Sequence, residues 1–394
     1  MIKKYLLITL NLLFFILPLV GCSSKHPAIE LSESTSAESI SSEPAESVSS
    51  EPAVSETVLE ESNSEKQTNE SSDEYSLDSD ILFEELKLGI DTIEKRKAAV
   101  NEMGEDIYWN GVFTSSNYIQ LLSCENSPIT NKIEDVYDGY TATVVQLTSN
   151  YDGHTIPADY ILANNKEDND TIIFIHGAGE NRRNNSNLHK LYLDLGYNIL
   201  AYDQRSSGEN EALFCTFGYL EQYDLKQYIE YVDGKITPDK KLLIYAKSQG
   251  GITACRVLGS DFGNEKIDAA ILDCPVTSMR QMIEPYCYQY VSEEEVDYYL
   301  ECGDQVLSYF IDGFTMAGSE MTEYMKNTTV PVLILTSKVD KIVDMSMPVS
   351  TYDVIPGTKK QLYVSETAYH CGIEVEEPEA YWNTVTEFLS NYIK

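Results

Sequence analysis

The segment Leu242-Leu243-Ile244-Tyr245-Ala246-Lys247-Ser248-Gln249-Gly250-Gly251 decides the fold. Its apolar first half predicts a buried strand, and the small residues after it predict a helix that begins at once. Ser248 stands at the junction, in the tight turn of a nucleophile elbow. The residues two before and two after such a serine must be small, and Ala246 and Gly250 meet that need. An ordinary glycine-rich turn looks similar, so the motif becomes specific only with catalytic partners.

Those partners are found further along the chain. A serine hydroxyl becomes a good nucleophile only beside a base, and the base needs a group that orients it. Of the five histidines, only His370 follows the last predicted strand, and Asp340 lies just past an earlier apolar run. The order Ser248, Asp340, His370 therefore predicts a catalytic triad at the carboxyl edge of a parallel sheet. Asp344 and Asp273 are weaker alternatives for the acid.

A second glycine-rich turn, His176-Gly177-Ala178-Gly179-Glu180, follows the predicted strand at 171–175. Such a turn can direct a backbone N–H group at the negative oxygen that forms on a substrate carbonyl. We predict an oxyanion hole made by the amides of Ala178 and Gln249, the residue after the nucleophile. His176 is predicted to hold the turn, and the alternative is that it serves as the catalytic base.

Strands and helices alternate over most of the chain, which predicts an α/β fold with a mostly parallel sheet and helices on both faces. A predicted hairpin, at 140–147 and 154–163, comes first. The alternation lapses in a tyrosine-rich, helical insertion at about 275–329, which predicts a small cap. The predicted strands are 171–175, 198–202, 241–245, 269–272, 332–335 and 361–364, and the predicted helices are 188–195, 220–232, 249–258 and 379–393.

Residues 1–22 have the form of a secretory signal. Lys3 and Lys4 precede an apolar run that ends in Leu19-Val20-Gly21-Cys22. This end resembles the lipobox of bacterial lipoproteins, which implies a lipid-modified Cys22 and a chain anchored at the extracytoplasmic face of the cell membrane. The alternative is an uncleaved transmembrane anchor.

Residues 23–80 contain 18 Ser and 15 Asp+Glu among 58 residues, which predicts a disordered tether, or alternatively a binding tail. The globular part is then 81–394. It starts with an expected helix at 81–103, within a helical extension of about 81–135 that could pack on the sheet or form a stalk.

The formal net charge of −36 argues against nucleic acid as a partner.

Seven cysteines remain besides Cys22, and none shows a CxxC or Cys/His spacing typical of a metal site. No metal and no cofactor is therefore expected. Cys287 and Cys302 could form a disulfide, which the sequence does not decide.

The stretch from about 140 to 394 resembles the α/β-hydrolase superfamily. The turn at 176–180 is similar to that of monoglyceride lipases and serine aminopeptidase-type hydrolases. The segment 202–209 resembles their Asp-x-Arg-Gly-x-Gly-x-Ser loop, with Ser206 in place of a glycine. Leu272-Asp273-Cys274-Pro275 resembles bacterial hydrolases close to the prolyl-oligopeptidase-like group.

The resemblance implies a serine hydrolase that cleaves small-molecule carboxylic esters through an acyl-enzyme, similar to carboxylesterases and lipases. A peptidase or amidase of the same fold, acting on peptides, is the first alternative. A non-catalytic surface-binding homologue is the second, although such a module has no need for three catalytic groups in order.

Overall fold

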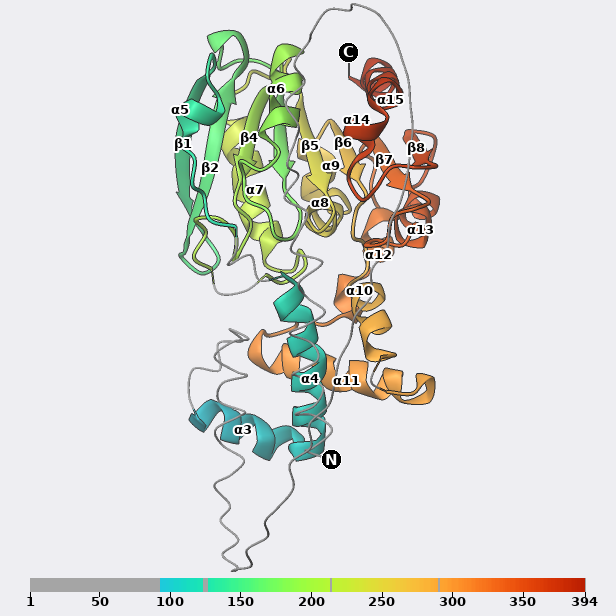
Figure 1. The fold of residues 1–394 in the computed structure, drawn as a ribbon. Coiled ribbons are helices and arrows are strands. Elements are labelled where there is room, and N and C mark those ends of the chain that lie inside the picture. The colour runs from blue at the N-terminus through green and yellow to red at the C-terminus, as the bar shows by residue number, and fades with distance from the viewer. Residues whose placement is uncertain (1–92, 123–126, 213–214, 290, 394) are drawn as a thin grey trace, which may run out of the picture. The chain divides into compact units, whose positions relative to one another are not determined.

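The computed structural model describes residues 93–122, 127–212, 215–289 and 291–393, all within the compact unit Asp80–Lys394. The predicted signal peptide, Cys22 and the tether lie outside the described residues, as does the first part of the helix expected at 81–103. Within the described part, the expected α/β architecture is confirmed (Figure 1).

Eight strands form one sheet in the order β1-β2-β4-β3-β5-β6-β7-β8. β1 pairs antiparallel with β2, β2 pairs antiparallel with β4, and the strands from β4 to β8 are parallel. The strands are β1 (Thr141–Thr148), β2 (Thr155–Leu162), β3 (Thr171–Ile175), β4 (Asn198–Tyr202), β5 (Leu242–Lys247), β6 (Ala269–Asp273), β7 (Val332–Ser337) and β8 (Lys360–Ser365).

The parallel strands β3 to β7 are buried along their whole length, because helices cover both faces of the sheet. One apolar core packs α7 and α8 on one face, and a second core packs α6 and α15 on the other. The helices are α3 (Ile93–Met103), α4 (Glu105–Leu122), α5 (Ile133–Val136), α6 (Ser186–Asp194), α7 (Glu221–Asp233), α8 (Gly250–Leu258), α9 (Asp261–Lys266), α10 (Met279–Cys287), α11 (Glu293–Phe310), α12 (Thr322–Met325), α13 (Ser346–Val354), α14 (Ile373–Glu376) and α15 (Pro378–Tyr392), with 3₁₀ turns η1 (Ala163–Asn165) and η2 (Ala317–Ser319).

The insertion between β6 and β7 contains α10, α11, η2 and α12, which lie in the range predicted for a cap. α4, which lies within the helical extension expected at about 81–135, packs against α11 below the sheet in Figure 1. Thr114 Oγ1 of α4 donates a hydrogen bond of 3.0 Å to the Tyr299 carbonyl of α11. The sequence left open whether this extension packs on the sheet or forms a stalk. In the described part, α4 packs on α11 of the cap instead.

The crossing of α4 and α11 depends on Gly111, and we expect Gly111→Ala to destabilise the fold. A Cβ atom at Gly111 would lie 2.2 Å from the backbone oxygen of Cys302, which cannot move without shifting α11. Such overpacking costs about 1–3 kcal/mol in the free energy of unfolding, measurable by urea denaturation. Gly234→Ala is the matched control, because its nearest neighbour, the Glu230 oxygen, lies 3.5 Å away. Equal stability of the two variants would contradict close packing of α4 on α11.

Candidate active site

Ser248 follows β5 directly and has a φ of +48°, in the left-handed region that non-glycine residues rarely adopt. Its amide donates a 2.9 Å hydrogen bond to the Asp273 carbonyl at the end of β6. The turn is tight because Gly250 has no side chain: a Cβ there would lie 2.6 Å from the Ile175 oxygen. These constraints hold the Ser248 hydroxyl at the carboxyl edge of the sheet, in the geometry of a nucleophile elbow.

Asp340 and His370 are directly paired. Nδ1 of His370 lies 2.7 Å from Oδ2 of Asp340, whose other oxygen accepts the amides of Ile342 at 2.8 Å and Val343 at 3.0 Å. The Asp340 side chain is fully buried, and His370 is 14% exposed. A carboxylate only accepts hydrogen bonds, so Nδ1 of His370 carries the proton and Nε2 is left as the basic nitrogen.

This pairing changes the pKa of both groups. Burial opposes the charge of His370, but the interactions with Asp340, and after them those with Cys274, outweigh it and raise the pKa of His370 above its ordinary value. Burial likewise opposes the charge of Asp340, but His370 and the two backbone amides lower the pKa of Asp340 below its ordinary value. Asp340 therefore stays ionised and favours the imidazolium that forms when His370 accepts a proton.

The loops that carry Ser248 and His370 meet at the Asp273 carbonyl. This oxygen accepts the Ser248 amide and also the Cys371 thiol, whose Sγ lies 3.4 Å away. Among the described residues, no hydrogen bond joins the Ser248 hydroxyl to His370, and Nε2 of His370 lies 3.6 Å from Cys371 Sγ. Serine-to-histidine hydrogen bonds in free enzymes are often long and tighten with substrate.

The other two candidate acids do not contact His370 in the structure. Asp344 accepts a 2.9 Å hydrogen bond from the Ser346 amide at the start of α13. Asp273 is fully buried and accepts a 3.1 Å hydrogen bond from the Tyr245 hydroxyl. Asp340 is thus the carboxylate that the fold brings to His370.

The turn predicted for the oxyanion hole packs on the elbow. A Cβ atom at Gly177 would lie 3.2 Å from Cβ of Ser248. Glu180 closes the turn, because its Oε2 accepts the Gly177 amide at 2.9 Å. Ala178 is exposed next to Gly177, and Gln249 precedes the first turn of α8. The turn at 176–180 and the start of α8 therefore both lie next to Ser248, and the oxyanion hole stays a prediction.

His176 is buried, and both of its ring nitrogens are engaged. Nδ1 lies 2.8 Å from the Gly177 carbonyl, and Nε2 accepts the Gln204 amide at 3.0 Å. The ring therefore joins the turn after β3 to the loop after β4. This agrees with the structural role predicted for His176, which is to hold the turn.

Lys247 is a positioning residue that the sequence did not single out. Although it precedes Ser248, its side chain is buried and its Nζ lies 3.0 Å from Oδ1 of Asn185 and 3.5 Å from Oε1 of Glu374. Burial opposes its charge, but Glu374 and other neighbouring acids raise the pKa of Lys247 above its ordinary value. The signal in the sequence that could have identified it is a single lysine at the end of an otherwise apolar predicted strand. Its charge ties the nucleophile strand to α14, which begins just after His370.

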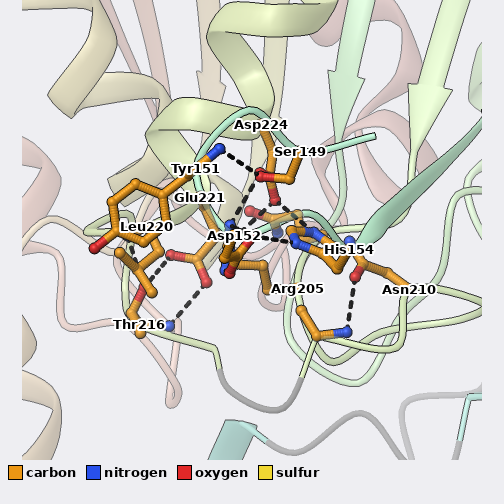
Figure 2. A network of polar contacts seen from close by, with 12 residues as sticks. Ser149, Tyr151, Asp152, His154, Arg205, Asn210, Thr216, Leu220, Glu221 and Asp224 are labelled. Carbon is orange, nitrogen blue, oxygen red and sulfur yellow. Dashed lines mark hydrogen bonds and ion pairs between the residues drawn. The ribbon is translucent and has the colours of Figure 1, made fainter. Parts of the chain in front are cut away.

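Figure 2 shows Arg205 among the side chains of Asp152, His154 and Asp224. Arg205 Nη1 donates to Asp152 Oδ2 at 2.6 Å, and its Nη2 donates to Asp224 Oδ1 at 3.1 Å. Ser206, which stands where the resembling loop has a glycine, takes a φ of +58°. The network fixes the loop after β4 to the β1–β2 hairpin and to α7. It has a structural explanation without any ligand.

A family model matches the central part of this chain. Residues 170–293 match the model for the alpha/beta hydrolase fold, over the stretch that contains the elbow and the turn at 176–180. The described part of this chain has the α/β-hydrolase fold. Uncharacterized protein YqkD of Bacillus subtilis (strain 168) is 27% identical over 223 residues, which are 56% of this chain and 71% of YqkD.

Two solved structures share the α/β-hydrolase fold with this chain. The esterase Pf2001 of Pyrococcus furiosus has a TM-score of 0.52 at 20% identity, over 68% of this chain and all of that one. The alpha/beta hydrolase GrgF of Penicillium sp. sh18 has a TM-score of 0.50 at 15% identity, over 64% of this chain and 99% of its own. At these identities the matches show a shared fold and leave the activity and the substrate open.

Proposed function

We propose that this α/β-hydrolase is a serine hydrolase that cleaves carboxylic esters and is held by a lipid anchor at Cys22 on the outer face of the cell membrane. The observation that carries the catalytic part is the 2.7 Å contact between His370 and the buried Asp340, at the strand edge where Ser248 adopts its left-handed turn. This arrangement supports a triad in which Ser248 is the nucleophile, His370 the base and Asp340 the orienting acid.

The proposed mechanism begins with attack of Ser248 Oγ on the ester carbonyl. Nε2 of His370 takes the hydroxyl proton and returns it to the leaving alcohol, so that an acyl-enzyme remains. The amides of Ala178 and Gln249 donate hydrogen bonds to the oxyanion. His370 then activates a water that releases the acid, while Asp340 keeps the proton on Nδ1 and stabilises the imidazolium.

The substrate class rests on the family resemblance rather than on a shaped acyl pocket. The tyrosines of the cap could have lined such a pocket, but Tyr288 is 47% exposed and Tyr298 is 41% exposed. The Tyr288 hydroxyl donates to Glu284 of α10, the helix that Tyr288 ends, and the Tyr298 hydroxyl donates to Asp106 of α4. These two side chains therefore lie on the outer surface of the cap and do not line an enclosed pocket.

Membrane attachment is proposed from the first 22 residues alone, and all of them lie outside the described part. Over the residues that the structure does describe, no helix is both long and apolar enough to cross a bilayer. Labelling of cells with a palmitate analogue tests the anchor. Incorporation should occur in the wild type and should disappear in Cys22→Ala, and label that persists in the variant would contradict it.

A fluorophosphonate probe tests the catalytic part without knowledge of the substrate. The full chain, purified in mild detergent, should be labelled, and Ser248→Ala should not be. Folded wild type that resists the probe would contradict an activated serine. A matched pair of acyl ester and acyl anilide substrates then separates an esterase from a peptidase or amidase, and we expect the ester to be cleaved faster.

The pH dependence of labelling provides a further prediction. His370 must be neutral to accept the serine proton, and its raised pKa keeps it protonated to higher pH than an ordinary histidine. The labelling rate should therefore rise with pH, with a midpoint above the ordinary histidine value of 6.5. Stopped-time labelling between about pH 5 and 10 measures this midpoint. A midpoint below 6.5 would contradict a base paired with ionised Asp340.

A further inference from the structure

Two thiols and the basic nitrogen of His370 lie together beside the proposed catalytic serine. The ligand atoms of Cys274, His370 and Cys371 all lie within 4.8 Å of one another. Cys371 Sγ lies 3.6 Å from His370 Nε2. Both cysteines are free thiols. The sequence concealed this group because Cys274 follows β6, whereas Cys371 follows β8.

The separations fit one kind of ligand. Zinc binds thiolate sulfur at about 2.3 Å and imidazole nitrogen at about 2.0–2.1 Å, in a tetrahedron. Sulfur and nitrogen in such a site are separated by roughly 3.6 Å, and two sulfurs by roughly 3.8 Å, from the same bond lengths. Two thiolates and an imidazole are a donor set that selects soft divalent ions such as Zn²⁺.

The site is held in place before any ion arrives. Cys274 has a φ of +44° and Cys371 a φ of +51°, and such conformations persist only where the surrounding structure imposes them. The Cys371 amide lies 3.4 Å from Cys274 Sγ, so the two loops are already in contact. The other ring nitrogen of His370 is fixed by Asp340 at 2.7 Å, which directs Nε2 to the thiols and is the kind of support that zinc-bound histidines have.

We propose that Cys274, Cys371 and His370 Nε2 form a binding site for a thiophilic divalent cation, Zn²⁺ being the best fit, and that the bound ion switches the enzyme off. Two sulfur–metal bonds and one nitrogen–metal bond form, the two thiol protons leave to solvent, and no atom changes oxidation state. A fourth position remains for water or a substrate oxygen. The ion occupies the lone pair that would accept the Ser248 proton, so the serine loses its base.

The acidity of the chain favours access of such an ion. The formal net charge is −36, which raises the local concentration of cations at the surface. His370 is 14% exposed, and Cys371 is also partly exposed, whereas Cys274 is buried. The site therefore opens toward solvent on the side of His370 and Cys371.

Cobalt spectroscopy tests the binding independently of any activity. The full-length protein, reduced with a phosphine, is titrated with Co²⁺ and then with Zn²⁺. We expect a thiolate-to-cobalt charge-transfer band in the wild type, its removal by Zn²⁺, and its loss in Cys274→Ala and in Cys371→Ala. Cys287→Ala is the matched control, since it removes a buried thiol from α10 and should keep the band. No band in the wild type, or an unchanged band in the Cys274/Cys371 double variant, would overturn the site.

The inhibitory consequence rests on the proposed function and has its own readout. Saturating Zn²⁺ should slow fluorophosphonate labelling of Ser248 at least tenfold, a chelator should restore it, and Cys371→Ala should require far more Zn²⁺ for the same effect. If the cobalt band forms but Zn²⁺ does not slow labelling, inhibition by the bound ion would be overturned and the binding site would stand. A wild type that is never labelled would overturn the proposed function, and the cobalt titration would still decide whether the ion binds.

Discussion

Ser248→Ala is expected to lower turnover of an ester substrate by roughly 10³-fold or more, with little change in KM. The variant removes the only atom that forms the acyl bond in the proposed mechanism, and it leaves the left-handed turn and the Asp273 contact in place. The hydroxyl acts only in the chemical step, so substrate binding should survive. Initial rates over a substrate series, with active-site titration of the wild type, provide the measurement.

A second serine variant separates loss of chemistry from loss of fold. Ser260 caps α9, and its side chain accepts the Gly263 amide at 3.1 Å. Ser260→Ala should cost about 1 kcal/mol of stability and leave turnover per folded molecule near that of the wild type. Ser248→Ala should show the opposite pattern. Wild-type turnover in purified Ser248→Ala would remove the proposed mechanism.

The parallel sheet could be predicted almost residue by residue because its strands are buried on both faces. Mostly apolar runs such as 171–175 and 198–202 match β3 and β4 in full. The hairpin also agrees within about one residue, since the turn at 150–153 fixes its register. Periodicity and turn chemistry are local signals, and these elements depend on little else.

Features that depend on contacts between distant segments could not be read from the sequence. α4 carries an acidic start and a mixed polar and aromatic body, and its place becomes clear only where Gly111 meets α11. Some residues of the candidate site could likewise be predicted from the sequence, and others could not. Chain order and strand ends predicted the Asp340–His370 pair, because the fold class imposes them.

No comparable rule of chain order predicts the two thiols beside His370. Cys274 and Cys371 lie far apart in the sequence and meet because the loop after β8 reaches the end of β6. Cys287 and Cys302, the pair that the sequence offered for a disulfide, are both free thiols in the cap. Cysteine spacing left the first pairing undecided and gave no sign of the second, because the sequence does not encode either pairing locally.

Asp340→Asn is expected to lower turnover by about 10⁴-fold while the fold is retained. Asparagine preserves the shape and can still accept the Ile342 and Val343 amides, at 2.8 and 3.0 Å in the wild type. Its NH₂ group can donate to Nδ1 of His370, which moves the ring proton to Nε2 and leaves no lone pair facing the serine. The loss of negative charge also removes the main cause of the raised pKa of His370.

Two measurements distinguish this tautomer effect from general damage to the site. The midpoint of the pH profile for fluorophosphonate labelling should move to lower pH in Asp340→Asn, because the imidazolium has lost its ionised partner. Asp344→Asn is the matched control: it lies four residues away, caps the start of α13 through the Ser346 amide, and should keep both the rate and the midpoint of the wild type. If Asp344→Asn lost activity and Asp340→Asn did not, the acid would be Asp344 and His370 would have to leave its present partner. Equal, small losses in the two variants would mean that His370 is not the base, since no base so placed could tolerate the loss of its orienting carboxylate.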